Sequence, residues 1–239
     1  MLNLLAAAAF FVGIHLLVSG TRLRDAVTAR IGERVYLALF SLASLAGIVW
    51  LALAYGAARS SGYTPLWGQL HALMPVAVVV MLVAFVLMVF GLLTPNPGAV
   101  MQEHTLDAEQ PARGILRVTR HPFLWGAFLW AATHLVINGD AAALILFGAF
   151  VLLTVLGTRS IDAKRKRALG YRWNRFAAVT SNVPFVAILS GRNRLKLAEL
   201  ASWKALIAVL AFFAVWHGHA WLFGVSAIPP PGVEVLVRP

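Results

Sequence analysis

The chain has 239 residues, of which 60% are hydrophobic and only 12% are charged, and its mean hydropathy is +0.80. A soluble fold of this size cannot bury so much apolar side chain, because its surface is too large for its volume. Cysteine is absent, which excludes disulfides, iron–sulfur ligation, covalently attached c-type haem and thiolate catalysis. The net charge of +11 is placed along the chain in a way that favours a membrane surface over a nucleic acid partner.

Six apolar stretches follow one another, each near the roughly 17–25 residues that a helix needs to cross a bilayer. They lie at about 2–20, 34–57, 70–93, 122–138, 140–158 and 202–224. The first stretch is followed by its charges rather than preceded by them, so we interpret it as an uncleaved helix and not as a signal peptide. We therefore expect an all-α helix bundle with about six transmembrane helices, forming a single domain over residues 1–239.

Residues that favour turns mark the boundaries of the fourth span. Pro122 suits the first turn of a helix, where its missing N–H costs nothing. Asn138-Gly139-Asp140 separates the fourth span from the fifth, and all three residues are common in turns. We therefore expect these two spans to form a tight hairpin.

Arginine and lysine are concentrated in three connecting segments. Residues 21–34, 94–121 and 159–204 hold 18 of the 20 basic residues, and only Arg59 and Arg238 lie elsewhere. Cytoplasmic loops are enriched in these residues, so with six spans these segments face the cytoplasm and both termini face outward. We expect a multi-pass protein of the inner membrane, with the basic segment 159–201 lying on anionic lipid.

Two histidines lie within predicted spans, where an ionisable side chain is costly unless it has a partner or a function. His15 lies roughly 8 Å from the cytoplasmic end of the first span, at about 1.5 Å per residue. His134 lies roughly 20 Å deeper than His121 by the same rise. A neutral imidazole in such a place either ligates a metal or forms a structural hydrogen bond between helices.

The remaining histidines have simpler interpretations. His71, His217 and His219 lie near the outer interface among tryptophans, where a histidine usually hydrogen-bonds to lipid headgroups. His104 lies in a polar loop, where we expect it to be solvated.

Arg120-His121-Pro122 opens the fourth span and is a candidate catalytic cluster. An arginine and a histidine at a helix N-terminus can bind an anion or the polar edge of a cofactor. The alternative is that Arg120 reaches lipid phosphates while His121 caps the helix.

Taken together, five stretches resemble the NnrU family, which includes the plant and cyanobacterial ζ-carotene isomerases. The stretches are His15 followed by Arg22; Gly32-Glu33-Arg34; Arg120-His121-Pro122 with His134 thirteen residues later; Asn138-Gly139-Asp140; and Thr180-Ser181-Asn182-Val183-Pro184-Phe185 leading to Ala187-Ile188-Leu189-Ser190-Gly191-Arg192. The likeness extends from the first helix to about residue 192.

The resemblance implies a membrane protein that binds b-type haem. The haem ligands of the isomerases match His15 and His134, and a further functional histidine matches His121. The implied reaction is cis-to-trans isomerisation of one double bond in a hydrophobic polyene, gated by the redox state of the haem. For bacterial members the resemblance implies a link to denitrification and nitric oxide metabolism.

The sequence departs from the isomerase pattern at two places. Tyr55-Gly56 stands where the isomerases have a histidine, and Ala131 stands where they have a cysteine before the histidine that matches His134. The predicted spans also place His15 and His134 roughly 11 Å apart in depth. One iron bridges that separation only if its axis lies near the membrane normal, so His121 is the rival second ligand.

Two other classes of function stay open at this point. The Arg-His-Pro-x-x-x-Gly pattern, followed by a basic segment ending in Pro184, also resembles membrane methyltransferases of the isoprenylcysteine type, which use S-adenosylmethionine. That type of enzyme is expected to have a pair of acidic residues after the helix that follows this pattern. Here only Asp162 is present, with the basic residues Arg159 and Lys164 close to it in sequence, which argues against this interpretation. A non-enzymatic partner in membrane assembly is the third interpretation. Membrane lipid is an expected partner in all three, and the oligomeric state is open.

Overall fold

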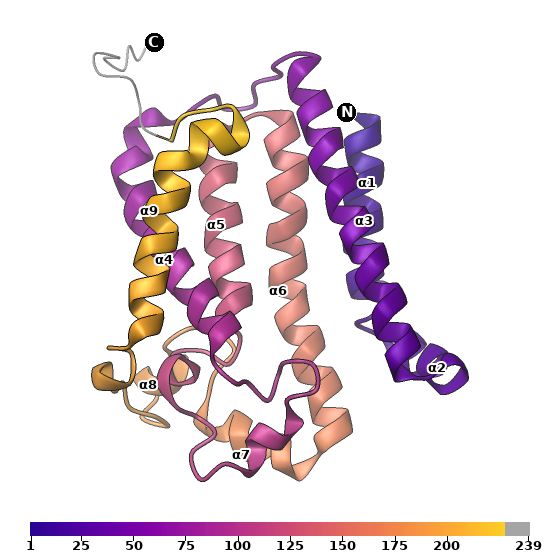
Figure 1. Ribbon diagram of the computed structural model, residues 1–239, viewed down its shortest axis with the longest axis vertical. Coiled ribbons are helices and arrows are strands. Elements are labelled where there is room, and N and C mark those ends of the chain that lie inside the picture. Colours follow the sequence, from indigo (N-terminus) through magenta and orange to yellow (C-terminus); the bar gives the residue numbers. More distant parts are fainter. Residues whose placement is uncertain (228–239) are drawn as a thin grey trace.

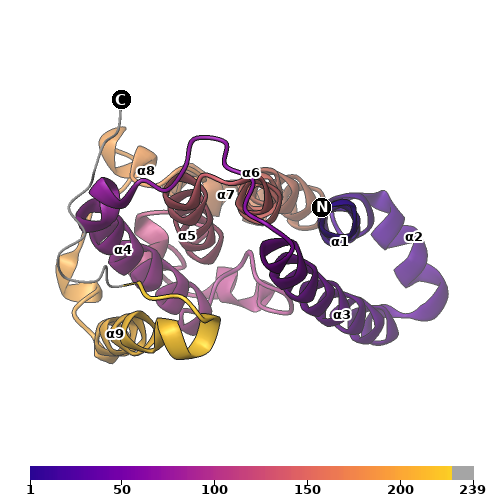
Figure 2. The same cartoon turned by 90° about the horizontal axis from the view of Figure 1, so that it is seen from above.

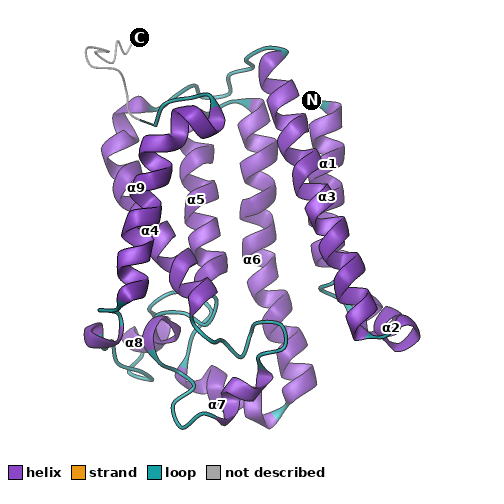
Figure 3. Ribbon diagram, viewed as in Figure 1, coloured by secondary structure: helices purple, strands orange, loops and turns teal. Residues whose placement is uncertain are grey.

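The computed structural model describes residues 1–227, which contain no β-strand and one isolated β-bridge, between Pro65 and Asp140 (Figure 3). The all-helical fold is therefore confirmed. Arg238 and the prolines at 229–231 lie outside the described residues. The long helices run side by side (Figure 1) and are α1 (Leu2–Gly13, continued by a π-helical turn at Ile14–Val18), α3 (Glu33–Ser60), α4 (Met74–Leu93), α5 (Pro122–Asn138), α6 (Ala141–Leu169) and α9 (Trp203–Phe223).

Within the described residues, four segments are by themselves long and apolar enough to cross a membrane: α3, α4 with the turn at His71–Leu73, α6 and α9. A fifth is Leu2–Val18, taken together with α2 (Arg22–Ile31), from which it is bent by 79°. The 17 residues of α5 cover only about 25 Å, slightly less than the roughly 30 Å of a hydrocarbon core. The structure thus supports four to five spans, with α5 packed among them.

The helix boundaries agree closely with the predicted spans except in α6. That helix was expected to end near residue 158 but continues to Leu169. The basic stretch that begins at Arg159 is therefore the last three turns of a long helix, and only α7 (Tyr171–Val179) and α8 (Val186–Leu189) follow as short separate helices. Lysine, arginine and alanine are good helix formers, so the helix continues past the end of its apolar part.

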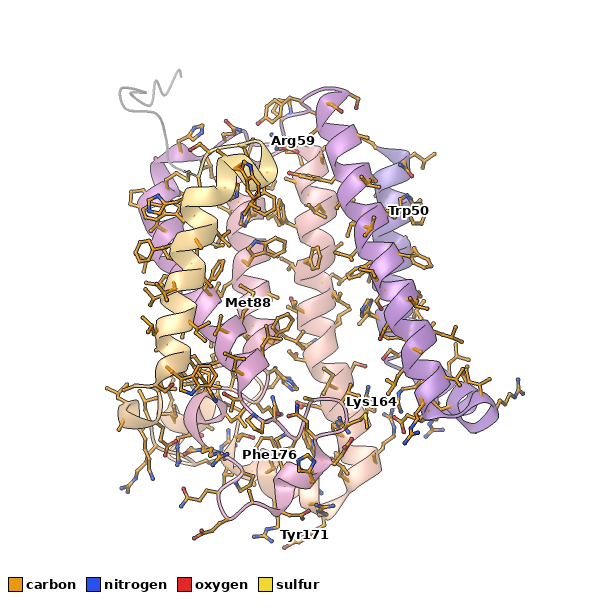
Figure 4. All side chains as sticks on the ribbon, viewed as in Figure 1. Trp50, Arg59, Met88, Lys164, Tyr171 and Phe176 are labelled. Atoms are coloured by element: carbon orange, nitrogen blue, oxygen red, sulfur yellow. The ribbon has the colours of Figure 1, made fainter. Side chains whose placement is uncertain are left out.

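The three basic segments lie at one end of the bundle, with α2, α7 and α8 (Figures 1 and 4). Lys164 and Tyr171 mark this loop end in Figure 4, and Arg59 marks the opposite end, where the N-terminus also lies (Figure 1). The charge pattern therefore corresponds to a real asymmetry of the molecule. Which compartment the loop end faces stays a prediction.

Seen from above, α4, α5, α6 and α1 follow one another in a row (Figure 2). Helix α9 packs against α4, and α3 packs against α1 and α6. One buried apolar cluster joins α1, α3 and α6 and includes Leu4, Phe11 and Leu51. A second joins α4, residues 112–118 and α7, and includes Trp173 and Phe176.

Two glycines allow α4 and α5 to approach closely. A Cβ on Gly126 would lie 2.6 Å from Cγ of Met88 and 2.7 Å from the carbonyl oxygen of Ala84, and a Cβ on Gly91 would collide with the backbone of Phe123. Small residues permit such close helix contacts in membranes, where packing rather than the hydrophobic effect drives association. The position of α5 therefore depends on these two glycines.

Gly126→Ala is expected to destabilise the fold by about 1–3 kcal/mol, because the added methyl group overpacks the contact with α4. Gly148→Ala in α6 is the matched control, since its added Cβ would have only the Leu144 side chain nearby, at 3.8 Å. Thermal unfolding in mild detergent measures both variants. An unfolding temperature of Gly126→Ala at or above that of the wild type contradicts the close contact.

Candidate functional site

The carboxylate of Asp162, near the loop end of α6, collects the polar side chains singled out in the sequence. Arg120 donates to it through Nε, at 2.8 Å from Oδ1, and through Nη2, at 2.5 Å from Oδ2. Nε2 of His121 lies 2.8 Å from Oδ1, and the Asn182 amide donates to Oδ2 at 3.1 Å. Because a carboxylate only accepts, Nε2 of His121 carries the proton in this contact.

Backbone hydrogen bonds join the two chain segments that meet at Asp162. The Arg120 amide donates to the Ser181 carbonyl at 2.9 Å, and the Phe185 amide donates to the Val118 carbonyl at 2.8 Å. The indole N–H of Trp125 donates to the Asn182 carbonyl at 2.7 Å. The structure thus brings together residues 118–125 and 181–185, two stretches that the resemblance had emphasised.

The Asp162 cluster balances its own charge, which limits what it can do. The carboxylate occupies the position in front of Arg120 that an anionic ligand would need, and His121 is buried, at 5% exposed. A buried charge pair with satisfied hydrogen bonds fixes geometry rather than offering a free binding site. The cluster therefore acts as a clamp that holds the first turn of α5 against α6.

A second ion pair and a set of backbone hydrogen bonds lie at the other end of α5, in the turn that joins it to α6. Asp140 caps α6 by accepting from the Ala143 amide at 2.8 Å, and Arg59 donates to its other oxygen at 3.3 Å. The Gly139 carbonyl accepts from the amides of residues 66–68. Gly139 has φ = 58°, and a side chain there would collide with Gly68 and Trp67, so the turn requires glycine.

His134 lies on α5 between these two sets of contacts. Its Nδ1 donates to the Trp130 carbonyl at 2.9 Å, which places the lone pair of the neutral ring on Nε2. The ring stacks on Phe147 of α6, with centroids 4.9 Å apart, and lies 6.4 Å from the ring of His219 on α9. An imidazole whose Nδ1–H is held by a backbone carbonyl is oriented for metal ligation through Nε2.

His15 has the same local hydrogen bond in different surroundings. It lies in the π-helical turn Ile14–Val18, and its Nδ1 donates to the Phe11 carbonyl at 2.7 Å. Its ring contacts Phe11 and Phe40, with centroid distances of 4.5 and 5.2 Å. Each predicted haem ligand thus fits the donor chemistry of an axial imidazole.

The structure does not bring His15 and His134 together. A chain of ring contacts connects them through Phe11, Phe150 and Trp130, with successive centroids 4.5, 5.7, 5.3 and 5.2 Å apart. Three aromatic side chains therefore stand between the two imidazoles. That His15 and His134 ligate one iron together therefore stays a prediction, because the two imidazoles are not adjacent in the structure.

Another ion pair, between Arg117 and Glu199, joins two segments at the loop end of the bundle. Arg117 donates to the Glu199 carboxylate through Nε and Nη2, at 2.8 and 2.9 Å, and the Gly114 amide adds a third hydrogen bond. The hydrogen bonds from Arg117 lower the pKa of Glu199 from its ordinary value of 4.5 to about 2. Glu199 therefore stays ionised at neutral pH and ties residues 114–117 to the segment before α9.

The surroundings of His219 include a contact that the sequence does not indicate. Its Nδ1 lies 2.7 Å from the Val225 carbonyl, and the centroid of its ring lies 6.4 Å from that of His134. Its expected contact with lipid headgroups stays a prediction.

Comparison with known proteins agrees with the resemblance. The family described as NnrU protein matches residues 3–227. The 15-cis-zeta-carotene isomerase of Zea mays chloroplasts is 27% identical over 176 residues, which are 72% of this chain and 47% of the relative. The Arabidopsis thaliana protein of the same name is 27% identical over 174 residues, 72% of this chain and 46% of the relative. The chain thus spans about half the length of these curated relatives, and no solved structure matches it.

Asp162→Asn is expected to destabilise the protein by about 3 kcal/mol, because it leaves the Arg120 guanidinium largely buried without a counter-charge. Asp107→Asn is the matched control, since Asp107 also pairs with an arginine, Arg172, but its side chain is 70% exposed. Both variants are compared with the wild type by thermal unfolding in detergent. Equal, small effects of the two substitutions would show that the Asp162 cluster is not a clamp.

Proposed function

The chain belongs to the NnrU family, and from that premise we propose that it is a membrane isomerase that converts a cis double bond of a carotenoid-type polyene to trans, with b-type haem as cofactor. The observation that carries the proposal is the similarity to two plant 15-cis-zeta-carotene isomerases over 72% of the chain. A bundle of membrane-type helices suits a substrate that dissolves in lipid rather than in water.

The curated relatives also favour an isomerase over a role in nitric oxide metabolism or denitrification, because both are named for an isomerisation. We place the protein in the inner membrane with its basic end toward the cytoplasm. This orientation follows from the positive-inside rule applied to the basic segments at the loop end.

His134 is the residue that would hold the haem iron from α5. Its Nδ1–H is committed to the Trp130 carbonyl, so Nε2 is the ligating atom. When bound, the haem would supply a redox-active iron whose interaction with the polyene lowers the barrier to rotation about one double bond. The resemblance gives the second ligand as His15, and the depths of the predicted spans make His121 its rival.

Aromatic residues of α5 and α6 set the environment of His134. Trp130 and Phe147 both contact the imidazole and pack edge to face on each other, with centroids 5.3 Å apart, and Phe150 packs on Trp130. Such a setting excludes water from a reactive iron and accepts an apolar polyene. We give Arg120 and His121 a positioning role, because their contacts with Asp162 hold α5 in place.

The direct test uses purified, haem-loaded protein in nanodiscs, with 15-cis-zeta-carotene as the substrate, in the dark. The dithionite-reduced wild type should convert the 15-cis isomer, as followed by chromatography, and the oxidised protein should not. His134→Ala should lose at least 90% of the activity together with the haem.

His104→Ala is the control for this test, because His104 is exposed in the loop before α5 and should leave both properties unchanged. A reduced, haem-loaded and folded wild type that leaves the 15-cis isomer intact would contradict the isomerase.

A further inference from the structure

We propose that the cavity between the loop ends of α4 and α9 binds the phosphate headgroup of an anionic membrane phospholipid, which Arg113 and Lys204 hold. The inference is independent of the proposed isomerase, because it concerns neither the haem nor the polyene. It assigns a discrete lipid site, whereas the composition predicts only general contact with lipid. Both cations lie outside the basic segment 159–201 that was expected to lie on the lipid surface.

The cavity lies at the level where the helices leave the membrane. Its volume is about 500 Å³, within the roughly 300–1,000 Å³ of pockets that bind small molecules. Phe90 and Thr94 line it from the end of α4, Lys204 lines it from the first turn of α9, and residues 108–110 and 113–115 complete it. Helices α4 and α9 pack on each other (Figure 2), and these two ends both lie at the loop end (Figure 1). Lipid phosphates lie at this depth, just outside the hydrocarbon core.

Two cations of the cavity lack a carboxylate partner within residues 1–227. Lys204 donates to the hydroxyl of the buried Thr94, at 3.1 Å, which leaves two of its three N–H donors. The guanidinium of Arg113 has five donors, and none of them has a partner in the described part of the chain. The charge that acts on the Lys204 ammonium is the like charge of Arg113. An anion between two such cations removes their repulsion.

The start of α9 adds positive potential beside the cavity. Lys204 lies in its first turn, and the N-cap residue Ser202 makes no side-chain hydrogen bond to the helix. The free amides of an uncapped helix carry a partial positive charge, equivalent to about half an elementary charge. An anion at Lys204 therefore also interacts favourably with the N-terminus of α9.

Two carboxylates also line the cavity, and they limit the charge of the ligand. Glu199 is matched by Arg117, which donates two hydrogen bonds to it, at 2.8 and 2.9 Å. Glu109 is exposed and forms no ion pair within the described residues. Two positive charges, on Arg113 and Lys204, and one negative charge, on Glu109, leave a net charge of +1. A phosphodiester, with its single negative charge, neutralises that charge.

Apolar side chains favour a lipid over a soluble phosphate. Phe90 and Ile115 line the cavity beside the two cations. Outside it, Leu93 of α4 and Ile207 of α9 are exposed near the same end, and the exposed Trp203 lies where tryptophans commonly meet the membrane interface. A lipid can place its phosphate in the cavity and its acyl chains along the two helices, as lipids do at basic pockets between transmembrane helices. A soluble phosphate gains nothing from these apolar contacts.

The experiment measures lipid binding to the full-length protein in an uncharged detergent, with dioctanoyl phosphatidylglycerol as the probe. Calorimetric titration gives the Kd, and native mass spectrometry gives the number of lipids that stay bound. Arg113→Gln and Lys204→Gln should each raise the Kd about tenfold, because each removes a charge-assisted hydrogen bond to the phosphate. Glu109→Gln should lower the Kd, because it removes the unpaired negative charge from the cavity.

Lys166→Gln is the matched control. Lys166 is an exposed lysine at the loop end of α6 that does not line the cavity, so its loss removes the same charge and should leave the Kd unchanged. Because Lys204 also bonds to Thr94, Arg113→Gln is the variant that reports on binding alone. Helical circular dichroism and thermal unfolding verify that each variant is folded.

Two further ligands identify the group that the cavity binds. Glycerol phosphate lacks the acyl chains and dioctanoylglycerol lacks the phosphate, and neither should bind at concentrations that saturate the site with phosphatidylglycerol. Glycerol phosphate that binds as tightly as the lipid would overturn the lipid assignment and leave a site for a soluble phosphate. Equal binding of dioctanoylglycerol, or equal effects of Lys166→Gln and Arg113→Gln, would overturn the phosphate site itself. The proposed isomerase is unaffected by either result.

Discussion

Two carboxylates, one at each end of α6, lie beside the two ends of α5, and the candidate site depends on the constraints there: Asp162 binds Arg120 and His121 at the start of α5, and Asp140 binds Arg59 of α3 next to the turn that ends α5. Asp140 at the start of α6 and Asp162 near its loop end are 22 residues apart, about 33 Å along a helix, which is close to the thickness of a hydrocarbon core. Each pairs with an arginine, Arg59 or Arg120, where charged groups are costly unless neutralised. Because α5 is short and packs against α4 through Gly126, little freedom remains for the side chains between these ends.

The fixed position of α5 determines which side chains His134 contacts. Its ring is fixed from below by the Trp130 carbonyl and from one side by Phe147, so the nearest imidazole is that of His219 on α9. Helix α9 packs chiefly on α4, the same helix that receives α5, which keeps the two histidines at one depth. The contacts of Asp162, the aromatic rings around His134 and the nearby ring of His219 thus all result from one arrangement of α4, α5, α6 and α9.

Much of this fold could be predicted from the sequence, where local signals were strong. The bounds of α5 agree with 122–138 because Pro122 and the turn at 138–140 mark both ends. The end of α6 could not be predicted from hydropathy, since the change to basic residues at Arg159 marks the end of its apolar part, and the helix itself ends only before Gly170. Contacts between distant residues were also invisible: Asp162 lies 42 residues from Arg120, and nothing in either local pattern pairs His134 with His219.

The absence of cysteine from the chain allows a direct measurement of where His134 points. Two cysteine pairs, at positions 134 and 219 and at positions 15 and 134, are introduced separately and treated in native membranes with a short bifunctional thiol reagent. Efficient cross-linking of the 134–219 pair and none of the 15–134 pair is the predicted result, because three aromatic rings separate His15 from His134. Cross-linking of the 15–134 pair alone would show that α5 presents His134 to α1, and would contradict the account.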